Sequence, residues 1–265
     1  MDVDAVVIDL DGTVYLGDEL LDGVSDAITT LRERGYDLLF VTNNPTRSPA
    51  GYVDRLADLG IDADESQILS AGTVTAEFLA DRHAGDDVYV IGSDGLLTQL
   101  DNASVAVTDD PDRADVLVTS HCYDFEYDDL TQGLWALDDG ETAFYGTDRD
   151  LTYPNNDGRE YPGSGAITRA VAGVTEREPD RVLGKPSGVM IELIAERLTR
   201  PERCCIVGDS LDTDIALGER AGMATVLVLS GRTDHIAIDD ASVTPDHILD
   251  GLVDLPALLE ECGNV

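Results

Sequence analysis

The chain has 265 residues, of which 43% are hydrophobic, and it carries 54 acidic against 17 basic side chains for a formal charge of −37. This length supports a substantial core, and the hydrophobic content excludes a disordered acidic tail. So large a negative charge argues against nucleic acids or anionic membranes as partners.

Self-repulsion of this size destabilises a compact fold unless salt screens it, and the Debye length falls to roughly 3 Å at ~1 M salt. We therefore expect a cytoplasmic protein from a halophilic organism. The N-terminal Met1-Asp2-Val3-Asp4 lacks the basic region of a secretory signal, and no apolar run approaches ~18 residues. Neither a signal peptide nor a membrane span is expected.

Short apolar runs alternate with amphipathic patterns along the chain, which predicts an α/β fold with a parallel sheet. The predicted strands, in chain order, are Ala5–Ile8, Asp37–Val41, Val88–Ile91, Val116–Val118, Ala143–Tyr145, Cys204–Val207 and Ala224–Leu229. The predicted helices are Val24–Arg34, Ser48–Leu59, Thr73–Arg82, Tyr127–Leu137, Ser164–Ala172, Ser187–Leu198 and Asp212–Ala221. Gly35, Gly60 and Gly222 follow three of these helices, where left-handed C-caps are expected.

The middle of the chain differs in composition. Residues 81–180 are rich in Asp pairs, Gly and Pro, especially Thr147–Gly165. We interpret this stretch as an inserted second domain, with residues 1–80 and 181–265 forming the core. A single long sheet with irregular connections is the alternative.

Polar clusters follow three of the predicted strands, at the edge where ligands collect in open parallel sheets. Asp9 and Asp11 follow the first strand, Thr42, Asn43 and Asn44 follow the second, and the third cluster is Asp209, Ser210, Asp212, Thr213 and Asp214. Alternate carboxylates at a strand end are suited to a hard cation such as Mg²⁺. Taken alone, Asp212 and Thr213 fit helix capping as well as ligation.

Lys185 is the single lysine of the chain and lies in Gly184-Lys185-Pro186-Ser187. Lysine provides a compact point charge that arginine does not reproduce. Carboxylates from two strand ends, a hydroxyl and amide loop and one lysine together predict a magnesium-dependent phosphoryl-transfer site. A carboxylate nucleophile would split hydrolysis into two easier steps.

Four segments, in this order, resemble the motifs of the haloacid dehalogenase-like (HAD) phosphohydrolases: Asp9-Leu10-Asp11-Gly12-Thr13-Val14-Tyr15, Thr42-Asn43-Asn44, Gly184-Lys185-Pro186 and Gly208-Asp209-Ser210 with Thr213-Asp214. The resemblance implies a Rossmann-like HAD core with a parallel sheet. It also implies that Asp9 is the nucleophile, that Asp11 is the general acid and base, and that Lys185 neutralises charge. Thr42, Asn43 and Asn44 would bind the phosphoryl group. Asp9, the Asp11 backbone carbonyl, Asp209 and Asp214 would form the Mg²⁺ site.

The insertion lies between the second and third motifs, as in members with an α/β C2-type cap. Its Thr147–Pro154 and Pro162–Gly165 segments resemble those of subclass IIA, the NagD-like and p-nitrophenyl-phosphatase-like enzymes. Asp148 and Tyr153 are the expected substrate contacts there, with His121, Tyr123 and Arg149 as further candidates. The chain departs from the family pattern at Asp148, where members often have Asn. It departs again at Cys122, where they often have Asp.

The expected function is therefore Mg²⁺-dependent hydrolysis of small organic phosphomonoesters, of the sugar phosphate, nucleotide, glycerol phosphate or phosphoglycolate class. A phosphonatase would need a lysine in the insertion, which has none. A dehalogenase would lack Asp11, and a mutase would carry its insertion between the first two motifs. The alternative function is that of a catalytically weak regulator that binds a phosphorylated ligand. By analogy with relatives, we also expect a homodimer that forms through the cap.

Overall fold

The computed structural model describes residues 3–154, 159–198, 200–233, 238, 241 and 243–263. Packing divides the chain into two compact units. The first comprises Met1–Thr42, Pro49–Leu69 and Met190–Val265, and the second comprises Asn43–Ser48 and Ser70–Val189.

The second unit is broader than the predicted insertion at 81–180. Helix α3 (Ala71–Arg82) belongs to it because it packs against α4 (Asp94–Asn102). Residues 43–48 belong to it as well, since Gln99 Nε2 donates to Pro45 O at 3.1 Å. The assignment of this unit as a cap stays a prediction.

The first unit is built on a six-stranded sheet in the order β15-β14-β13-β1-β4-β5. Its strands are β1 (Ala5–Ile8), β4 (Asp37–Thr42), β5 (Ile68–Ser70), β13 (Cys204–Gly208), β14 (Ala224–Val228) and β15 (His247–Leu249). Strand β1 pairs in parallel with both β13 and β4. All four of its residues are buried, which is what a continuous apolar run in a parallel sheet requires.

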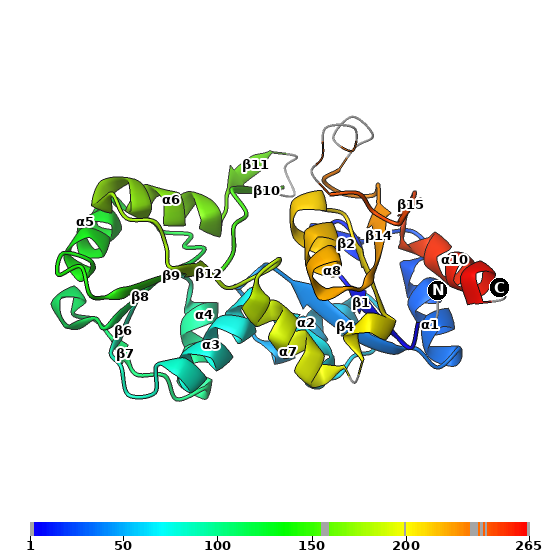
Figure 1. Cartoon of the computed structure of the whole chain (residues 1–265), viewed down its shortest axis with the longest axis horizontal. Coiled ribbons are helices and arrows are strands. Elements are labelled where there is room, and N and C mark those ends of the chain that lie inside the picture. Colours follow the sequence, from blue (N-terminus) through cyan, green and yellow to red (C-terminus); the bar gives the residue numbers. More distant parts are fainter. Residues whose placement is uncertain are drawn as a thin grey trace. The chain divides into compact units, whose positions relative to one another are not determined.

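The helices of the first unit are α1 (Val24–Glu33), α2 (Pro49–Asp58), most of α7 (Gly188–Arg197), α8 (Ala216–Ala221) and α10 (Leu255–Gly263). Helices α1 and α10 lie side by side (Figure 1) and bury Ile28, Leu31 and Leu255 in a cluster that includes β1 side chains. A small antiparallel hairpin joins β2 (Tyr15–Leu16) to β3 (Glu19–Leu20).

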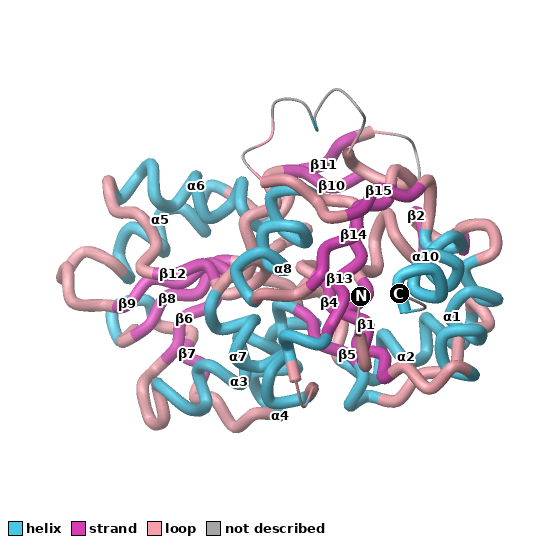
Figure 2. The backbone as a smooth tube through the Cα atoms, turned by 45° about the vertical axis from the view of Figure 1, so that its right-hand side comes forward, coloured by secondary structure: helices cyan, strands magenta, loops and turns pink. Residues whose placement is uncertain are grey.

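The second unit contains a five-stranded sheet in the order β12-β9-β8-β6-β7, in which all neighbouring strands are parallel. Its strands are β6 (Val88–Ile91), β7 (Val107–Thr108), β8 (Val116–Thr119), β9 (Ala143–Gly146) and β12 (Arg181–Val182). Helices α5 (Tyr127–Ala136) and α6 (Ser164–Thr175) cover one face, and α3 and α4 lie on the other (Figures 1 and 2). An antiparallel hairpin, β10 (Thr152–Pro154) and β11 (Glu160–Pro162), follows β9.

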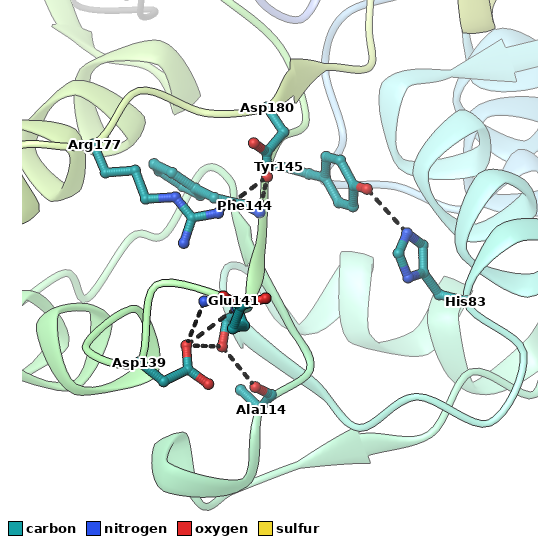
Figure 3. A network of polar contacts seen from close by, with 9 residues as sticks. His83, Ala114, Asp139, Glu141, Phe144, Tyr145, Arg177 and Asp180 are labelled. Atoms are coloured by element: carbon teal, nitrogen blue, oxygen red, sulfur yellow. Dashed lines mark hydrogen bonds and ion pairs between the residues drawn. The ribbon is translucent and has the colours of Figure 1, made fainter.

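Polar contacts tie the loops of the second unit to its sheet. Figure 3 shows the Tyr145 hydroxyl of β9 directed at His83, whose Nε2 lies 3.0 Å away, while His83 Nδ1 lies 2.8 Å from Asp86 Oδ2. Also on β9, the backbone N–H of Phe144 donates to Asp180 Oδ2 at 2.8 Å. Strand β9 is therefore anchored from both the α3 side and the segment that leads into β12.

The α/β class and all seven predicted strands are confirmed, with ends within one residue of the prediction. Gly35, Gly60 and Gly222 have positive φ values of 85°, 79° and 71°, as expected of left-handed caps. The predicted helix at Asp212–Ala221 instead starts as a π-helical turn, Leu211–Ile215. Sequence reasoning omitted α4 and α10 and the short strands. It also omitted the 3₁₀ turns Glu65–Gln67, Pro111–Arg113, Pro201–Arg203 and Leu252–Asp254.

Among the helices that the structure describes, none has the length and apolar character needed to cross a bilayer.

Candidate active site

Three buried carboxylates meet at the carboxyl end of the first unit's sheet. Asp9 follows β1 and Asp209 follows β13, and these strands are hydrogen-bonded neighbours. Asp214 belongs to the π-helical turn after β13. One oxygen from each of the three lies within 4.8 Å of the others, and the residues are 6%, 7% and 1% exposed. Parallel pairing thus brings together side chains that lie some 200 positions apart.

Neutral donors hold each carboxylate in place. Thr13 Oγ1 donates to Asp9 Oδ2 at 3.1 Å, Arg232 N donates to Asp209 Oδ2 at 2.6 Å, and Ser210 N donates to Asp214 Oδ2 at 3.1 Å. These bonds orient the carboxylates without cancelling their charge.

The donor set suits a hard divalent cation. Three like charges so close together and out of water repel one another strongly unless a positive charge compensates them. Carboxylate oxygens are also the ligands that Mg²⁺ prefers. The backbone next to Asp209 leaves no room for a side chain at Gly12 or Gly231, since a Cβ at either position would collide with Asp209 Oδ2. The residues present therefore fit a bound Mg²⁺.

Asp11 stands apart from this cluster. Its side chain is exposed, on a tight turn in which Gly12 N donates to Tyr15 O at 2.8 Å and Thr13 N donates to Leu10 O at 3.2 Å. Asp11 lies two residues beyond Asp9 in the chain and is not one of the three grouped carboxylates. This position agrees with the predicted proton-transfer role, which stays a prediction.

The residues at the end of the second predicted strand belong to different units. Thr42 closes β4 in the first unit and is 2% exposed. Asn43 belongs to the second unit, where its Nδ2 donates to Asp150 Oδ2 at 3.2 Å. Asn44 Oδ1 accepts from Thr46 N at 3.1 Å and from Thr46 Oγ1 at 2.7 Å, so this oxygen supports a local turn.

Lys185 pairs with Asn43 through its backbone. Lys185 N donates to Asn43 Oδ1 at 2.7 Å, and Asn43 Nδ2 donates to Lys185 O at 3.3 Å. The lysine is 2% exposed, and the preceding Gly184 N donates to Thr147 O at 2.6 Å. Two sequence motifs predicted to bind phosphate are therefore in direct contact within the second unit.

Asp148, a predicted substrate contact, is 2% exposed and makes hydrogen bonds inside the second unit. Thr147 Oγ1 donates to its Oδ2 and Asp150 N donates to its Oδ1, each at 3.1 Å. Burial, followed by the charge of Asp150, raises the pKa of Asp148 to about 7. These contacts give Asp148 a structural role inside the second unit.

Tyr153, the other predicted contact, lies on β10 in an aromatic cluster. Its ring centroid is 5.2 Å from that of His121 and 6.1 Å from that of Tyr161. Tyr123 meets His121 edge-on at 4.3 Å and is 71% exposed, and Arg149 is exposed as well. The structure thus joins three of the residues that sequence reasoning had considered separately.

Sequence reasoning missed one pair beside Asp9. Tyr15 is 1% exposed, and the guanidinium carbon of Arg55 lies 4.4 Å from its ring centroid. Burial, then the charge of Asp11, raises the pKa of Tyr15 well above its usual value. Tyr15 is the last residue of the first motif, but no sequence signal connects it with Arg55 on α2.

Comparison with known proteins gives consistent matches over both units. The family described as haloacid dehalogenase-like hydrolase matches residues 6–106, and the family described as HAD-hydrolase-like matches residues 182–255. Sugar-phosphatase AraL of Bacillus subtilis is 36% identical over 257 residues, which cover 97% of this chain and 93% of that protein. Phosphoglycolate phosphatase 2 of Arabidopsis thaliana is 32% identical, over 97% and 94% of the two chains.

Solved structures agree. A p-nitrophenyl phosphatase from Archaeoglobus fulgidus superimposes with a TM-score of 0.90 at 32% identity, over 97% of this chain and 100% of that one. NagD from E. coli K-12 superimposes with a TM-score of 0.85 at 26% identity, over 96% and 98% of the two chains.

Proposed function

Because the chain belongs to the haloacid dehalogenase-like hydrolases, and its relatives are phosphatases of small phosphate esters, we propose that it is a Mg²⁺-dependent phosphomonoesterase that works through an aspartyl-phosphate. The observation that carries the proposal is the buried triad of Asp9, Asp209 and Asp214. Mg²⁺ bound by these carboxylates and by the Asp11 backbone carbonyl would neutralise charge on the phosphoryl group.

In the first step, an Asp9 carboxylate oxygen attacks phosphorus and the bond between phosphorus and the ester oxygen breaks. Asp11 gives its proton to the departing oxygen, so a neutral alcohol leaves. The hydrogen bond from Thr13 Oγ1 to Asp9 Oδ2 restricts the rotation of the nucleophile. Thr42, Asn43, Asn44 and Lys185 are the proposed ligands of the transferred phosphoryl group.

In the second step, Asp11 accepts a proton from water, and the resulting nucleophile attacks the phosphorus of the aspartyl-phosphate. Cleavage of the bond between phosphorus and Asp9 releases orthophosphate and restores both carboxyl groups to their initial state. Each residue of the pair thus acts twice, as expected of covalent catalysis.

The substrates that we propose are small organic phosphomonoesters, of the kinds named for the relatives: sugar phosphates, phosphoglycolate, nucleotides and p-nitrophenyl phosphate. The charge of −37 supports a halophilic, cytoplasmic setting, and a homodimer through the second unit is part of the same proposal.

The experiment is an assay of phosphate release from p-nitrophenyl phosphate in molar KCl, with and without Mg²⁺. We expect Asp9→Asn to abolish turnover, and Asp101→Asn, an equal change of charge at an exposed residue of α4, to have no effect. Unchanged turnover in Asp9→Asn would contradict the mechanism. No turnover by the unaltered protein on any of these esters would favour the regulatory alternative.

A further inference from the structure

His121 is buried and carries an unused polar atom. The residue is 7% exposed, and its Nε2 has no hydrogen-bond partner among the described residues. Leaving such an atom unpaired in the interior is unfavourable, and buried polar groups in native proteins are nearly always paired. A bound group that pairs with Nε2 would remove this cost.

The position of His121 relates it to the predicted phosphate ligands of the same unit. The register of the second sheet aligns Thr119 of β8, Gly146 of β9 and Val182 of β12 in one row. His121 lies two residues beyond this row, and Lys185 lies three residues beyond it. Both therefore lie at the carboxyl edge of one sheet, about 10 Å apart if measured as two strand spacings.

Hydrogen bonds along this edge confirm that the loops are in register. Thr147 N donates to Thr119 O at 3.0 Å, and Thr147 Oγ1 lies 3.0 Å from Ser120 Oγ, within hydrogen-bond distance. On its other side, the Thr147 carbonyl accepts from Gly184 N. One segment thus connects the loop of His121 with the loop of Lys185.

Aromatic rings surround the imidazole. Tyr123 and Tyr153 both meet it edge-on, and Tyr161 lies next to Tyr153. Tyr123 is the outermost ring at 71% exposed, and exposed side chains change rotamer on the picosecond to nanosecond scale. Because its ring packs against the imidazole, a change of the Tyr123 rotamer would uncover part of that imidazole. Tyrosine rings offer an apolar face together with a polar tip, which suits the C–H and O–H surface of a sugar.

The electrostatics of the loop disfavour an anionic ligand group. Burial lowers the pKa of His121, so the ring is neutral at pH 7. Burial is also the main cause of the raised pKa of the adjacent Cys122, and the charges of Asp129, Asp124 and Asp94 raise it further. The charged side chains that act on Cys122 are therefore acidic. A substrate carboxylate here would meet negative charge, whereas a hydroxyl can pair with either tautomer of a neutral imidazole.

We propose that His121, together with Tyr123, Tyr153 and Tyr161, forms a subsite that receives a neutral, hydroxyl-bearing organic group. The subsite selects phosphorylated sugars and polyols over phosphorylated carboxylic acids. This inference rests on the proposed phosphatase function and identifies its substrate class.

The kinetic test compares kcat/KM for ribose 5-phosphate, phosphoglycolate and p-nitrophenyl phosphate in molar KCl with Mg²⁺. The unaltered enzyme is expected to prefer ribose 5-phosphate to phosphoglycolate at least tenfold. His121→Phe keeps an aromatic ring but removes Nε2. It should lower the ratio of ribose 5-phosphate to p-nitrophenyl phosphate turnover about tenfold, the value of one hydrogen bond. Tyr127→Phe, at an exposed tyrosine of α5 outside the cluster, is the matched control and should leave the ratio unchanged.

A preference for phosphoglycolate, or an unchanged ratio in His121→Phe, would overturn the subsite while leaving the phosphatase assignment intact. Absence of turnover on all three esters would instead contradict the proposed function.

A binding measurement covers the case in which His121→Phe does not fold. In the Asp9→Asn protein labelled with ¹⁵N-histidine, ribose 5-phosphate should shift the imidazole signals of one of the four histidines, and orthophosphate or phosphoglycolate should not. Equal shifts with all three ligands, or none with ribose 5-phosphate, would refute the subsite.

Discussion

The backbone amide of Lys185 donates a 2.7 Å hydrogen bond to Oδ1 of Asn43, a residue 142 positions earlier in the chain. Asn43 returns a bond to the Lys185 carbonyl. This reciprocal pair joins two of the four motifs inside the second unit. The main chain of the single lysine is thereby positioned by the motif that is proposed to bind the phosphoryl group.

Lys185→Arg tests whether a compact ammonium is required. The lysine is 2% exposed, so a larger planar guanidinium would have to displace its neighbours. We expect kcat on p-nitrophenyl phosphate to fall by about 100-fold, comparable with the loss of a charge-stabilising group. Arg82→Lys, at a side chain that is 65% exposed, should leave kcat unchanged. Near-normal turnover in Lys185→Arg would mean that lysine was retained here by chance.

Asp209→Asn tests the metal site through two opposite effects. Without Mg²⁺ the variant should melt at a higher temperature than the unaltered protein, because one of three crowded negative charges is gone. With Mg²⁺ it should need a concentration about 10–100-fold higher for half-maximal activity, because a ligand oxygen is lost. Melting curves and activity titrations with Mg²⁺ measure the two effects. If both stay unchanged, the triad does not bind the metal.

Asp148 makes stability depend on pH. Its pKa is raised from 3.8 to about 7 by burial, so between these values the folded state keeps a proton that the unfolded chain releases. The contribution of Asp148 to the free energy of unfolding is therefore complete below about pH 4, declines as the pH rises, and is lost above about pH 7.

Asp148→Asn should accordingly be more stable than the unaltered protein at pH 8, with a difference that shrinks towards pH 4. Denaturant unfolding at several pH values in molar KCl measures it. Asp101→Asn on α4 changes the net charge equally at an exposed residue and serves as the control. Parallel pH profiles for all three proteins would contradict the raised pKa of Asp148.

Salt should stabilise the protein strongly. With a formal charge of −37, screening at ~1 M KCl shortens the Debye length to roughly 3 Å and removes most of the repulsion between surface carboxylates. We expect the melting temperature to rise steadily between about 0.1 M and molar KCl. A melting temperature that stays constant over this range would argue against the halophilic setting.

Local sequence predicted the long elements well, and for a physical reason. Ala5–Ile8 is a strand because four consecutive apolar residues can be buried on both faces only inside a covered sheet. The edge strands β5 and β15 escaped prediction because three residues carry too little periodicity to distinguish a strand from a loop. The π-helical turn at Leu211–Ile215 escaped as well, since its Asp and Thr residues also suit an ordinary helix start.

The sequence by itself determined the chemistry that this protein carries: the types and order of its polar clusters, their position after apolar runs, and the single lysine. These features are local, because a strand end follows directly from where a run of buried residues stops. The tertiary structure alone decided how those groups combine. Parallel pairing of β1 with β13 brings Asp9 near Asp209 and Asp214, and burial, followed by the charge of Asp150, raises the pKa of Asp148 to about 7. Register in the second sheet places His121 and Lys185 on one edge. Distance, burial and register join residues far apart in the chain, so they exist only once the chain has folded.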